Sequence, residues 1–116
     1  MVLGLARAER GLTMGDRILV TGGSGFLGTA VRRRLAAGGW RARLALRAPP
    51  SGPVAEETAI IGDFADPGAD WRAAMDGVAA VLHLAAVTHR PGATEADYHA
   101  LNVDATARLA RAVMDA

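Results

Sequence analysis

The segment 21–28, which reads Thr-Gly-Gly-Ser-Gly-Phe-Leu-Gly, constrains the fold of this chain more than any other. It follows the short apolar run 17–20 and precedes an amphipathic segment, which together predict a strand, a tight turn and a helix. Gly22 would allow the tight turn, Gly25 a close approach of the backbone to a bound group, and Gly28 close packing of the helix on the strand. The free amides and the dipole at the start of that helix would favour an anion such as a pyrophosphate.

Strand-like and helix-like segments alternate along the rest of the chain, which predicts parallel βαβ units. We expect strands over 17–21, 41–47, 58–62 and 79–85, and helices over 25–37, over 70–76 and from about residue 94. In the first helix Leu27, Val31 and Leu35 share one face, which we expect to lie on the sheet. The predicted fold class is α/β, with a parallel sheet and helices on both faces. The last helix is expected to start with Thr94 as its cap and Asp97 three residues later.

Size and charge narrow the classes of function. The chain has 116 residues, 51% of them hydrophobic, and a net charge of +1, which indicates one small domain and gives no reason to expect nucleic acid or a membrane surface as a partner. The absence of cysteine excludes disulfides and thiolate chemistry. His89 and His99 have no partner at ligand spacing, so no metal is expected. A cytoplasmic location is the default expectation.

Residues 1–13 differ in composition from the rest, and we expect them to be a disordered leader before a dinucleotide-binding domain over 14–116. The stretch is too short, and its charges are in the wrong place, for a signal peptide. Met1 and Met14 remain alternative start residues, because Met14 lies directly before the first strand.

Four segments of the chain resemble, in order and spacing, the N-terminal part of the extended short-chain dehydrogenase/reductase superfamily, the NAD-dependent epimerase/dehydratase family. These segments are the TGxxGFxG loop at 21–28, the GD-x-x-D stretch at 62–66, the HxAA sequence at 83–86, and the N-V-x-G-T sequence at 102–106, where Ala105 replaces the usual glycine. The resemblance covers nearly the whole chain but reaches only about the first half of a usual family member.

The resemblance implies an α/β, Rossmann-like parallel sheet with helices on both faces, truncated after about four strands in the order 3-2-1-4. It also implies a nicotinamide dinucleotide as cofactor. The residues expected to bind it are Gly22, Ser24, Gly25, Phe26, Leu27, Gly28, Arg47, Asp63, Phe64, Ala85 and Ala86. Asp63 would accept a hydrogen bond from the adenine amino group, although it could instead cap its own turn. Ala85 and Ala86 are small where the cofactor would pass above the strand. The ring of Phe26 is expected to fill the core.

Arg47 ends the second strand at the position that usually decides the choice of cofactor, and no carboxylate lies nearby in the sequence. A carboxylate there would accept a hydrogen bond from the ribose 2′-hydroxyl, whereas a guanidinium can pair with a 2′-phosphate. We therefore favour NADP(H), with NAD(H) as the alternative. Arg47 could also be only an exposed strand-end residue. The run Arg32–Arg34 could support the phosphate, but most of these arginines are expected to lie on the solvent-exposed face of the helix.

Catalysis in this superfamily depends on a Ser or Thr and on a Tyr-x-x-x-Lys pair. The only tyrosine here is Tyr98, the residue four places later is Asn102, and the chain has no lysine. We therefore assign no catalytic residue and expect the chain to be inactive alone. Asn102 could support catalysis or could be purely structural, and His83 is expected to be a packed, hydrogen-bonded residue rather than a base.

The sequence thus predicts the NAD(P)-binding portion of an extended short-chain dehydrogenase/reductase, of the nucleotide-sugar epimerase/dehydratase or ketone/aldehyde reductase type. The alternative is a non-catalytic dinucleotide-binding or sensing module that works with a partner chain. An exposed edge on the strand 79–85, or the last helix, would be the surface for a homo-oligomer.

Overall fold

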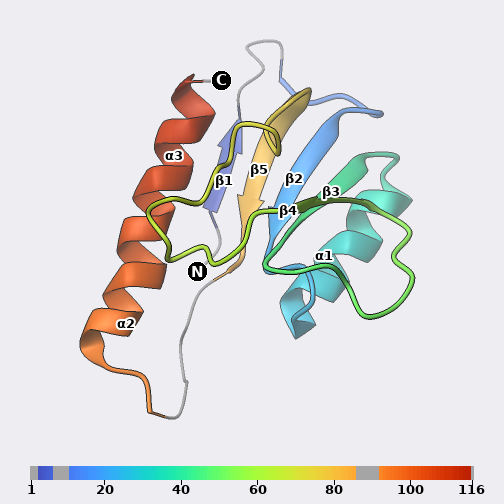
Figure 1. The fold of residues 1–116 in the computed structure, drawn as a ribbon. Coiled ribbons are helices and arrows are strands. Elements are labelled where there is room, and N and C mark those ends of the chain that lie inside the picture. Colours follow the sequence, from blue (N-terminus) through green and yellow to red (C-terminus); the bar gives the residue numbers. More distant parts are fainter. Residues whose placement is uncertain (1–2, 7–10, 86–91, 116) are drawn as a thin grey trace.

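The structure is a computed structural model and describes residues 3–6, 11–85 and 92–115 (Figure 1). Its elements are β1 (Leu3–Ala6), β2 (Arg17–Thr21), α1 (Phe26–Ala37), β3 (Arg41–Leu46), β4 (Glu57–Ile60), β5 (Val78–His83), α2 (Glu95–His99), the π-helical turn η1 (Ala100–Asp104) and α3 (Ala105–Asp115). The bounds of the four expected strands and of the first helix differ from the predicted ranges by at most two residues. The described part contains no helix with the length and hydropathy that crossing a bilayer requires.

Five strands form one sheet in the order β1-β5-β2-β3-β4. β5, β2, β3 and β4 are parallel neighbours, which confirms the predicted order 3-2-1-4. The chain leaves β2 toward β3 and β4 and then returns to the other side of β2 for β5. Strand order therefore reverses between β2 and β5, the place where ligands bind in open α/β sheets.

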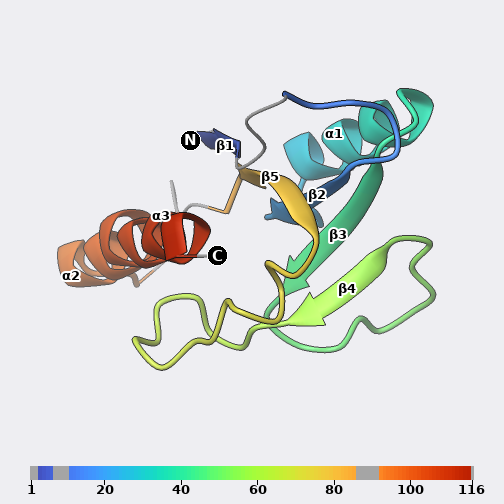
Figure 2. The ribbon, with the colours of Figure 1, turned by 90° about the horizontal axis from the view of Figure 1, so that it is seen from above.

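Both faces of the sheet are covered. Alternate residues of β2 face opposite sides, so Ile18 and Val20 belong to one apolar cluster and Leu19 to the other. The first cluster includes Leu35 of α1, and the second includes Leu109 of α3. Figure 2 shows the two helices on opposite sides of the sheet. The prediction of helices on both faces is confirmed.

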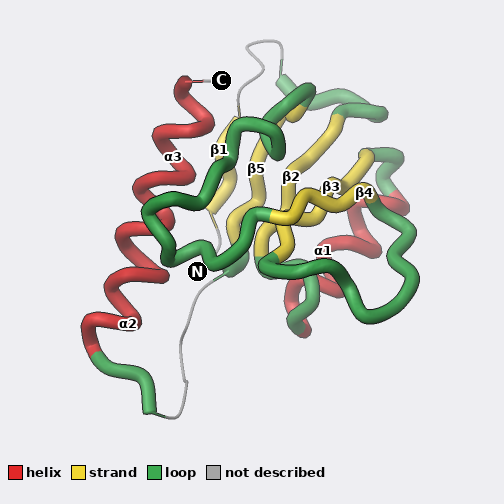
Figure 3. The backbone as a smooth tube through the Cα atoms, in the orientation of Figure 1, coloured by secondary structure: helices red, strands yellow, loops and turns green. Residues whose placement is uncertain are grey.

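The crossovers from β3 to β4 and from β4 to β5 are loops rather than helices (Figure 3). The helix expected over 70–76 is wrong: this stretch consists of hydrogen-bonded turns, in which the Met75 N–H donates to the carbonyls of Trp71 and Arg72, both at 3.1 Å. The segment lies between Gly68 and Gly77, and Gly77 has a φ of +69°. So short a stretch nucleates a helix poorly, and a single turn suffices to bury its apolar side chains.

β1 pairs antiparallel with β5, with Leu5 opposite Val81. The expectation that residues 1–13 are a disordered leader is therefore wrong for Leu3–Ala6, and the edge of β5 is not exposed along this stretch. The physical reason is that a strand edge presents a row of unpaired backbone groups, which a short apolar segment of the same chain satisfies here.

The last helical region begins as predicted. The Thr94 hydroxyl accepts the Asp97 N–H at 3.2 Å, and the Asp97 carboxylate accepts the Thr94 N–H at 2.9 Å, which is a complete capping box. The turn η1 then interrupts the α-helix before α3. Beyond it Ala105 and Leu109 are buried against the sheet. A π-helical turn shifts the register of the side chains by one residue and often lies at a functional site.

Candidate functional site

The glycine-rich loop joins the end of β2 to α1 and is packed tightly on itself. Gly22 has a φ of +70°, and a Cβ there would lie 2.7 Å from the backbone nitrogen of Ala85. A Cβ on Gly28 would lie 2.1 Å from the Gly22 carbonyl oxygen and 2.6 Å from the Gly23 Cα. Both glycines are therefore required by the fold: Gly22 for the turn beside β5, and Gly28 for the contact between the helix and the loop.

Gly25 is different from these two residues. Its φ is −78°, which any residue can adopt, and its added Cβ would meet only the Gly22 carbonyl oxygen, at 3.8 Å. Nothing within the described protein therefore requires a glycine at this position. A glycine that the fold does not need indicates close approach of a group from outside.

The N-terminus of α1 is open to an anion. Gly25 is the N-cap and provides no side-chain cap, and the first turn carries no acidic residue. The Thr29 N–H closes the first hydrogen bond of the helix, to the Gly25 carbonyl at 2.9 Å, so the preceding amides have no partner in the helical ladder. These amides and the positive end of the helix dipole favour a negatively charged ligand.

The side chains of the loop point outward. Ser24 is exposed, the Phe26 side chain is 97% exposed and Leu27 is 50% exposed. The expectations that Phe26 fills the core and that Leu27 faces the sheet are therefore wrong. The reason is the close packing of Gly28, which places this buried glycine on the face of α1 toward the sheet, with the half-buried Val31 and Leu35 following on that face.

A hydroxyl group joins the ends of β2 and β5. The Thr21 Oγ1 accepts the N–H groups of Leu84 and Ala85 at 3.0 and 3.1 Å and lies 2.6 Å from His83 Nδ1. Since this oxygen accepts two amides, its own proton is donated to Nδ1. The strand ends beside the glycine-rich loop are thereby held together.

The other ring nitrogen of His83 reaches the last helical region. Nε2 lies 2.9 Å from the Thr106 Oγ1, and the Thr106 hydroxyl donates to the Asn102 carbonyl at 2.9 Å. We assign the proton of the neutral ring to Nε2, which then donates to Thr106. His83 is 1% exposed, and burial lowers its pKa. The structure confirms His83 as a packed, hydrogen-bonded residue.

Sequence reasoning missed Thr21 and Thr106 as members of this network. Both lie inside the segments that carried the family resemblance, which was the available signal. The side chain of Asn102 is half-buried within η1, close to the end of the network.

Three further predicted residues follow strand ends, and Ala86 lies outside the described residues. Arg47 comes directly after β3 and is exposed, and no residue in the described part pairs with its guanidinium. Asp63 follows β4, and its Oδ1 accepts the Ala65 N–H at 3.0 Å, which is the turn-capping arrangement. The partly buried Phe64 ring packs against the core, 5.0 Å from the Trp71 ring.

Because the strands are parallel, the glycine-rich loop, Arg47, Asp63 and Ala85 all follow carboxyl ends of strands. The structure therefore brings these predicted residues to one edge of the sheet, on both sides of the switch point.

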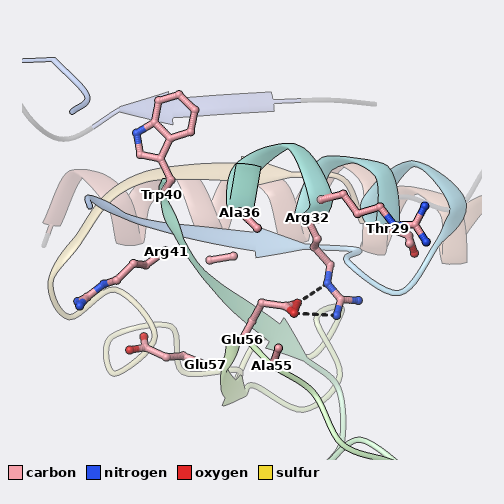
Figure 4. Close-up of a pocket in the computed structure, with 10 residues that line it drawn as sticks. Thr29, Arg32, Ala36, Trp40, Arg41, Ala55, Glu56 and Glu57 are labelled. Carbon is pink, nitrogen blue, oxygen red and sulfur yellow. Dashed lines mark hydrogen bonds and ion pairs between the residues drawn. The ribbon is translucent and has the colours of Figure 1, made fainter. Parts of the chain in front are cut away.

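Arg32 is not free to bind an anion. Its guanidinium forms a two-point ion pair with Glu56, with Nη2 to Oε1 at 3.1 Å, and Nη1 donates to the Gly23 carbonyl at 3.1 Å (Figure 4). This pair lies at a hollow of 520 Å³ between α1 and the segment 55–57. The hydrogen bond from Arg32 lowers the pKa of Glu56. Arg32 thus holds the glycine-rich loop in place through the Gly23 carbonyl, while Glu56 fixes the guanidinium.

Comparison with known proteins gives consistent matches. The sequence model of the NAD dependent epimerase/dehydratase family matches residues 18–116. The dTDP-L-rhamnose 4-epimerase of Burkholderia thailandensis is 38% identical over 116 residues, which covers 89% of this chain and 32% of that protein.

Two solved structures share the fold. A short-chain dehydrogenase/reductase superfamily protein from Agrobacterium tumefaciens with bound NAD has a TM-score of 0.67 and 35% identity, and the match covers 84% of this chain and 28% of that one. The enzyme WbmG of Bordetella bronchiseptica in complex with NAD and UDP has a TM-score of 0.67 and 28% identity, over 87% of this chain and 34% of that one.

This chain therefore spans about a third of the length of these relatives. The family match begins in β2 and continues through α3, so it includes the glycine-rich loop, all four parallel strands and the helix that carries Asn102. The chain belongs to the NAD dependent epimerase/dehydratase family.

Proposed function

We propose that this chain is the dinucleotide-binding portion of an NAD(P)-dependent epimerase, dehydratase or reductase, and that its loop 22–28 binds the cofactor pyrophosphate. One observation carries the proposal: the fold requires Gly22 and Gly28 but not Gly25, which lies at the uncapped N-terminus of α1. A pyrophosphate on the helix amides would explain both the small residue and the missing cap.

The residues present fit such a group. The backbone amides of the first turn of α1, together with the exposed Ser24 hydroxyl, would hold the phosphates. Asp63 has a second carboxylate oxygen besides the one in its turn, and this oxygen could accept the adenine amino group. The bound nicotinamide would supply hydride transfer. The chain itself lacks a Tyr-x-x-x-Lys pair, so we propose that it binds and orients the cofactor and is inactive alone.

For the choice of cofactor we propose NADP(H). The exposed Arg47 guanidinium follows β3 at the same edge of the sheet as the loop, and a guanidinium pairs well with a ribose 2′-phosphate. NAD(H) is the second candidate, because both solved neighbours described above contain NAD.

For the whole protein we propose a substrate of the nucleotide-sugar class. The support is the name of the Burkholderia relative, which is an epimerase of a dTDP-sugar, and the UDP present in the WbmG structure. The substrate would be bound largely by parts that this chain does not contain, since it covers about a third of each of these proteins.

Calorimetric titration of the 116-residue chain with NADPH and with NADH tests the site and the cofactor choice. We expect NADPH to bind more tightly, and Arg47→Asp to weaken NADPH by at least about tenfold while leaving NADH within about twofold. Arg72→Asp is the matched control, because Arg72 is exposed and lies before the amino end of β5. Equal binding of both cofactors, unaffected by Arg47→Asp, would remove the NADP(H) proposal, and binding of neither would remove the dinucleotide site.

A further inference from the structure

His83 is a buried titratable residue to which the proposed function gives no role. It ends β5 and is 1% exposed, and hydroxyl groups engage both of its ring nitrogens. One hydroxyl belongs to Thr21, the last residue of β2, and the other to Thr106, near the start of α3. The Thr21–His83–Thr106 link therefore joins the strand that leads into the glycine-rich loop to the helical region that carries Asn102.

The hydrogen bonds of this link all have the same direction. At one end the Thr21 oxygen accepts two backbone N–H groups, so its own proton goes to Nδ1 of His83. At the other end the Asn102 carbonyl only accepts, so the Thr106 hydroxyl donates to it and receives the Nε2–H. Both ends thus favour the same tautomer of the ring, and hydrogen bonds in such a chain strengthen one another. Because a backbone carbonyl does not pass a proton on, the link is a mechanical connection between two elements rather than a proton relay.

One end of the link is built into the glycine-rich loop. Gly22 directly follows Thr21, and a Cβ on Gly22 would lie 2.7 Å from the Ala85 nitrogen. The N–H of the same Ala85 donates to the Thr21 hydroxyl at 3.1 Å. Since closely packed groups transmit displacements, a ligand on the loop 22–28 that moves Gly22 also moves the Thr21 oxygen and the ring bonded to it.

The other end of the link lies on the irregular turn η1. There the Ala105 N–H donates to the Ala100 carbonyl, which is the π-helical pattern. The Thr106 hydroxyl donates to the Asn102 carbonyl inside this turn, and bonds of this kind compete with the helical ladder and bend it. A π-turn and an α-turn of the same residues differ by one residue in register. A conversion between them would therefore turn the Asn102 side chain to a different direction.

We propose that His83 is a positioning residue, which couples the occupation of the loop 22–28 by a dinucleotide to the placement of Asn102. The inference rests on the proposed function, because it takes the loop as the pyrophosphate site. A bound pyrophosphate fixes the loop, the loop fixes Thr21, and the link fixes the turn η1.

Two substitutions of His83 cut the link at different places. An asparagine Oδ1 is as many bonds from the backbone as the imidazole Nδ1, so His83→Asn can still accept the Thr21 proton but does not reach Thr106. A glutamine Nε2 corresponds in the same way to the imidazole Nε2, so His83→Gln can still donate to Thr106 but leaves the Thr21 proton without an acceptor. Thr106→Val cuts the helical end with little change of shape, and Thr106→Ser retains the hydroxyl. Thr58→Val, exposed on the edge strand β4, is the matched control.

The 116-residue chain and its variants are titrated with NADPH and with ADP. ADP carries the adenosine and the pyrophosphate but no nicotinamide, so it separates the effect of the link from direct contact between nicotinamide and Asn102. Calorimetry gives the dissociation constant, and NMR follows the side-chain amide resonances of Asn102. We expect ADP to shift these resonances, with the dissociation constant that calorimetry gives.

His83→Asn and Thr106→Val should abolish the ADP-induced shift at Asn102 while changing the dissociation constant for ADP by less than about twofold. His83→Gln should also abolish the shift and, because the buried Thr21 proton loses its acceptor, should raise the dissociation constant about three- to tenfold. Thr106→Ser should restore most of the shift, and Thr58→Val should leave the shift and the affinity unchanged. A purely structural His83 would not produce this difference between its two variants.

The inference is overturned if ADP binds without shifting Asn102, if the shift persists in both His83→Asn and Thr106→Val, or if the two His83 variants bind ADP equally. Thr106→Val and Thr106→Ser decide the matter alone if the His83 variants do not fold. Failure of the unsubstituted chain to bind either ADP or NADPH would instead overturn the proposed function, and the role of the link with it.

Discussion

Substituting alanine for Gly25 and for Gly28 separates what the glycine-rich loop does for the fold from what it does for a ligand. The two positions are three residues apart, but their surroundings differ. The added Cβ of Gly28→Ala would lie 2.1 Å from the Gly22 carbonyl oxygen, whereas that of Gly25→Ala would lie 3.8 Å from the same atom. The same chemical change is thus a backbone clash at one position and an ordinary contact at the other.

The magnitudes follow from these distances. In Gly28→Ala the helix and the loop must separate by about 1 Å, and overpacking of this kind costs about 1–3 kcal/mol, partly offset by the better helix propensity of alanine. We therefore expect the free energy of unfolding to fall by about 1–2 kcal/mol. In Gly25→Ala the loss at the N-cap amounts to about 0.5–1 kcal/mol, because alanine caps more poorly than glycine. The stiffer unfolded chain returns about 0.4–1 kcal/mol, so stability should change by less than about 0.5 kcal/mol.

Gly25→Ala should weaken cofactor binding even though it hardly changes stability. A Cβ on Gly25 would separate a pyrophosphate from the amides of α1, and we expect at least about tenfold weaker NADPH binding, or about 1.4 kcal/mol. Urea unfolding followed by tryptophan emission measures stability, and calorimetry measures binding. The reasoning is refuted if Gly25→Ala binds NADPH as well as the unsubstituted chain, or if it loses as much stability as Gly28→Ala.

Two further predictions concern the interior and the last helix. Burial lowers the pKa of His83 below its ordinary value of 6.5. Below about pH 6.5 the unfolded chain therefore binds a proton that the folded chain does not. The free energy of unfolding should fall with decreasing pH, by up to about 1.4 kcal/mol per pH unit. Urea unfolding at about pH 7.5 and about pH 5.5 should show a smaller difference for His83→Gln than for the control His99→Gln, and equal differences would contradict a buried neutral ring. Thr94→Ala removes the capping box and should lower the free energy of unfolding by about 1 kcal/mol, while Thr94→Ser should retain most of it; no loss in the same urea assay would show that the start of α2 does not contribute to stability.

The sheet was largely predictable from local sequence. Apolar runs marked β2 and β5, because a strand buried on both faces needs apolar side chains along its length. β3 was marked by apolar residues that alternate with arginine and alanine. The glycine-rich turn located α1, and Thr94 with Asp97 located the start of α2, because capping depends only on residues close together in the chain. The strand order was expected from the family resemblance.

The errors have a common origin in long-range contacts. The face of α1 toward the sheet passes through Gly28 rather than Leu27 because the helix touches the loop there, and helical periodicity alone does not say which stripe will be pressed on a neighbour. β1 pairs with the edge strand β5. The composition of the first 13 residues does not reveal this partner, because the edge exists only in the folded sheet.

The sequence by itself determined the strand–turn–helix unit and the residue types gathered in its loop, since both depend on neighbours along the chain. Only the tertiary structure distinguished Gly25, which the fold does not need, from Gly22 and Gly28, which it does. Only the tertiary structure, too, placed Thr21, His83 and Thr106 in one line of hydrogen bonds. The reason is that steric exclusion and hydrogen bonding act between atoms close in space, and these residues meet only when β2, β5 and α3 are assembled.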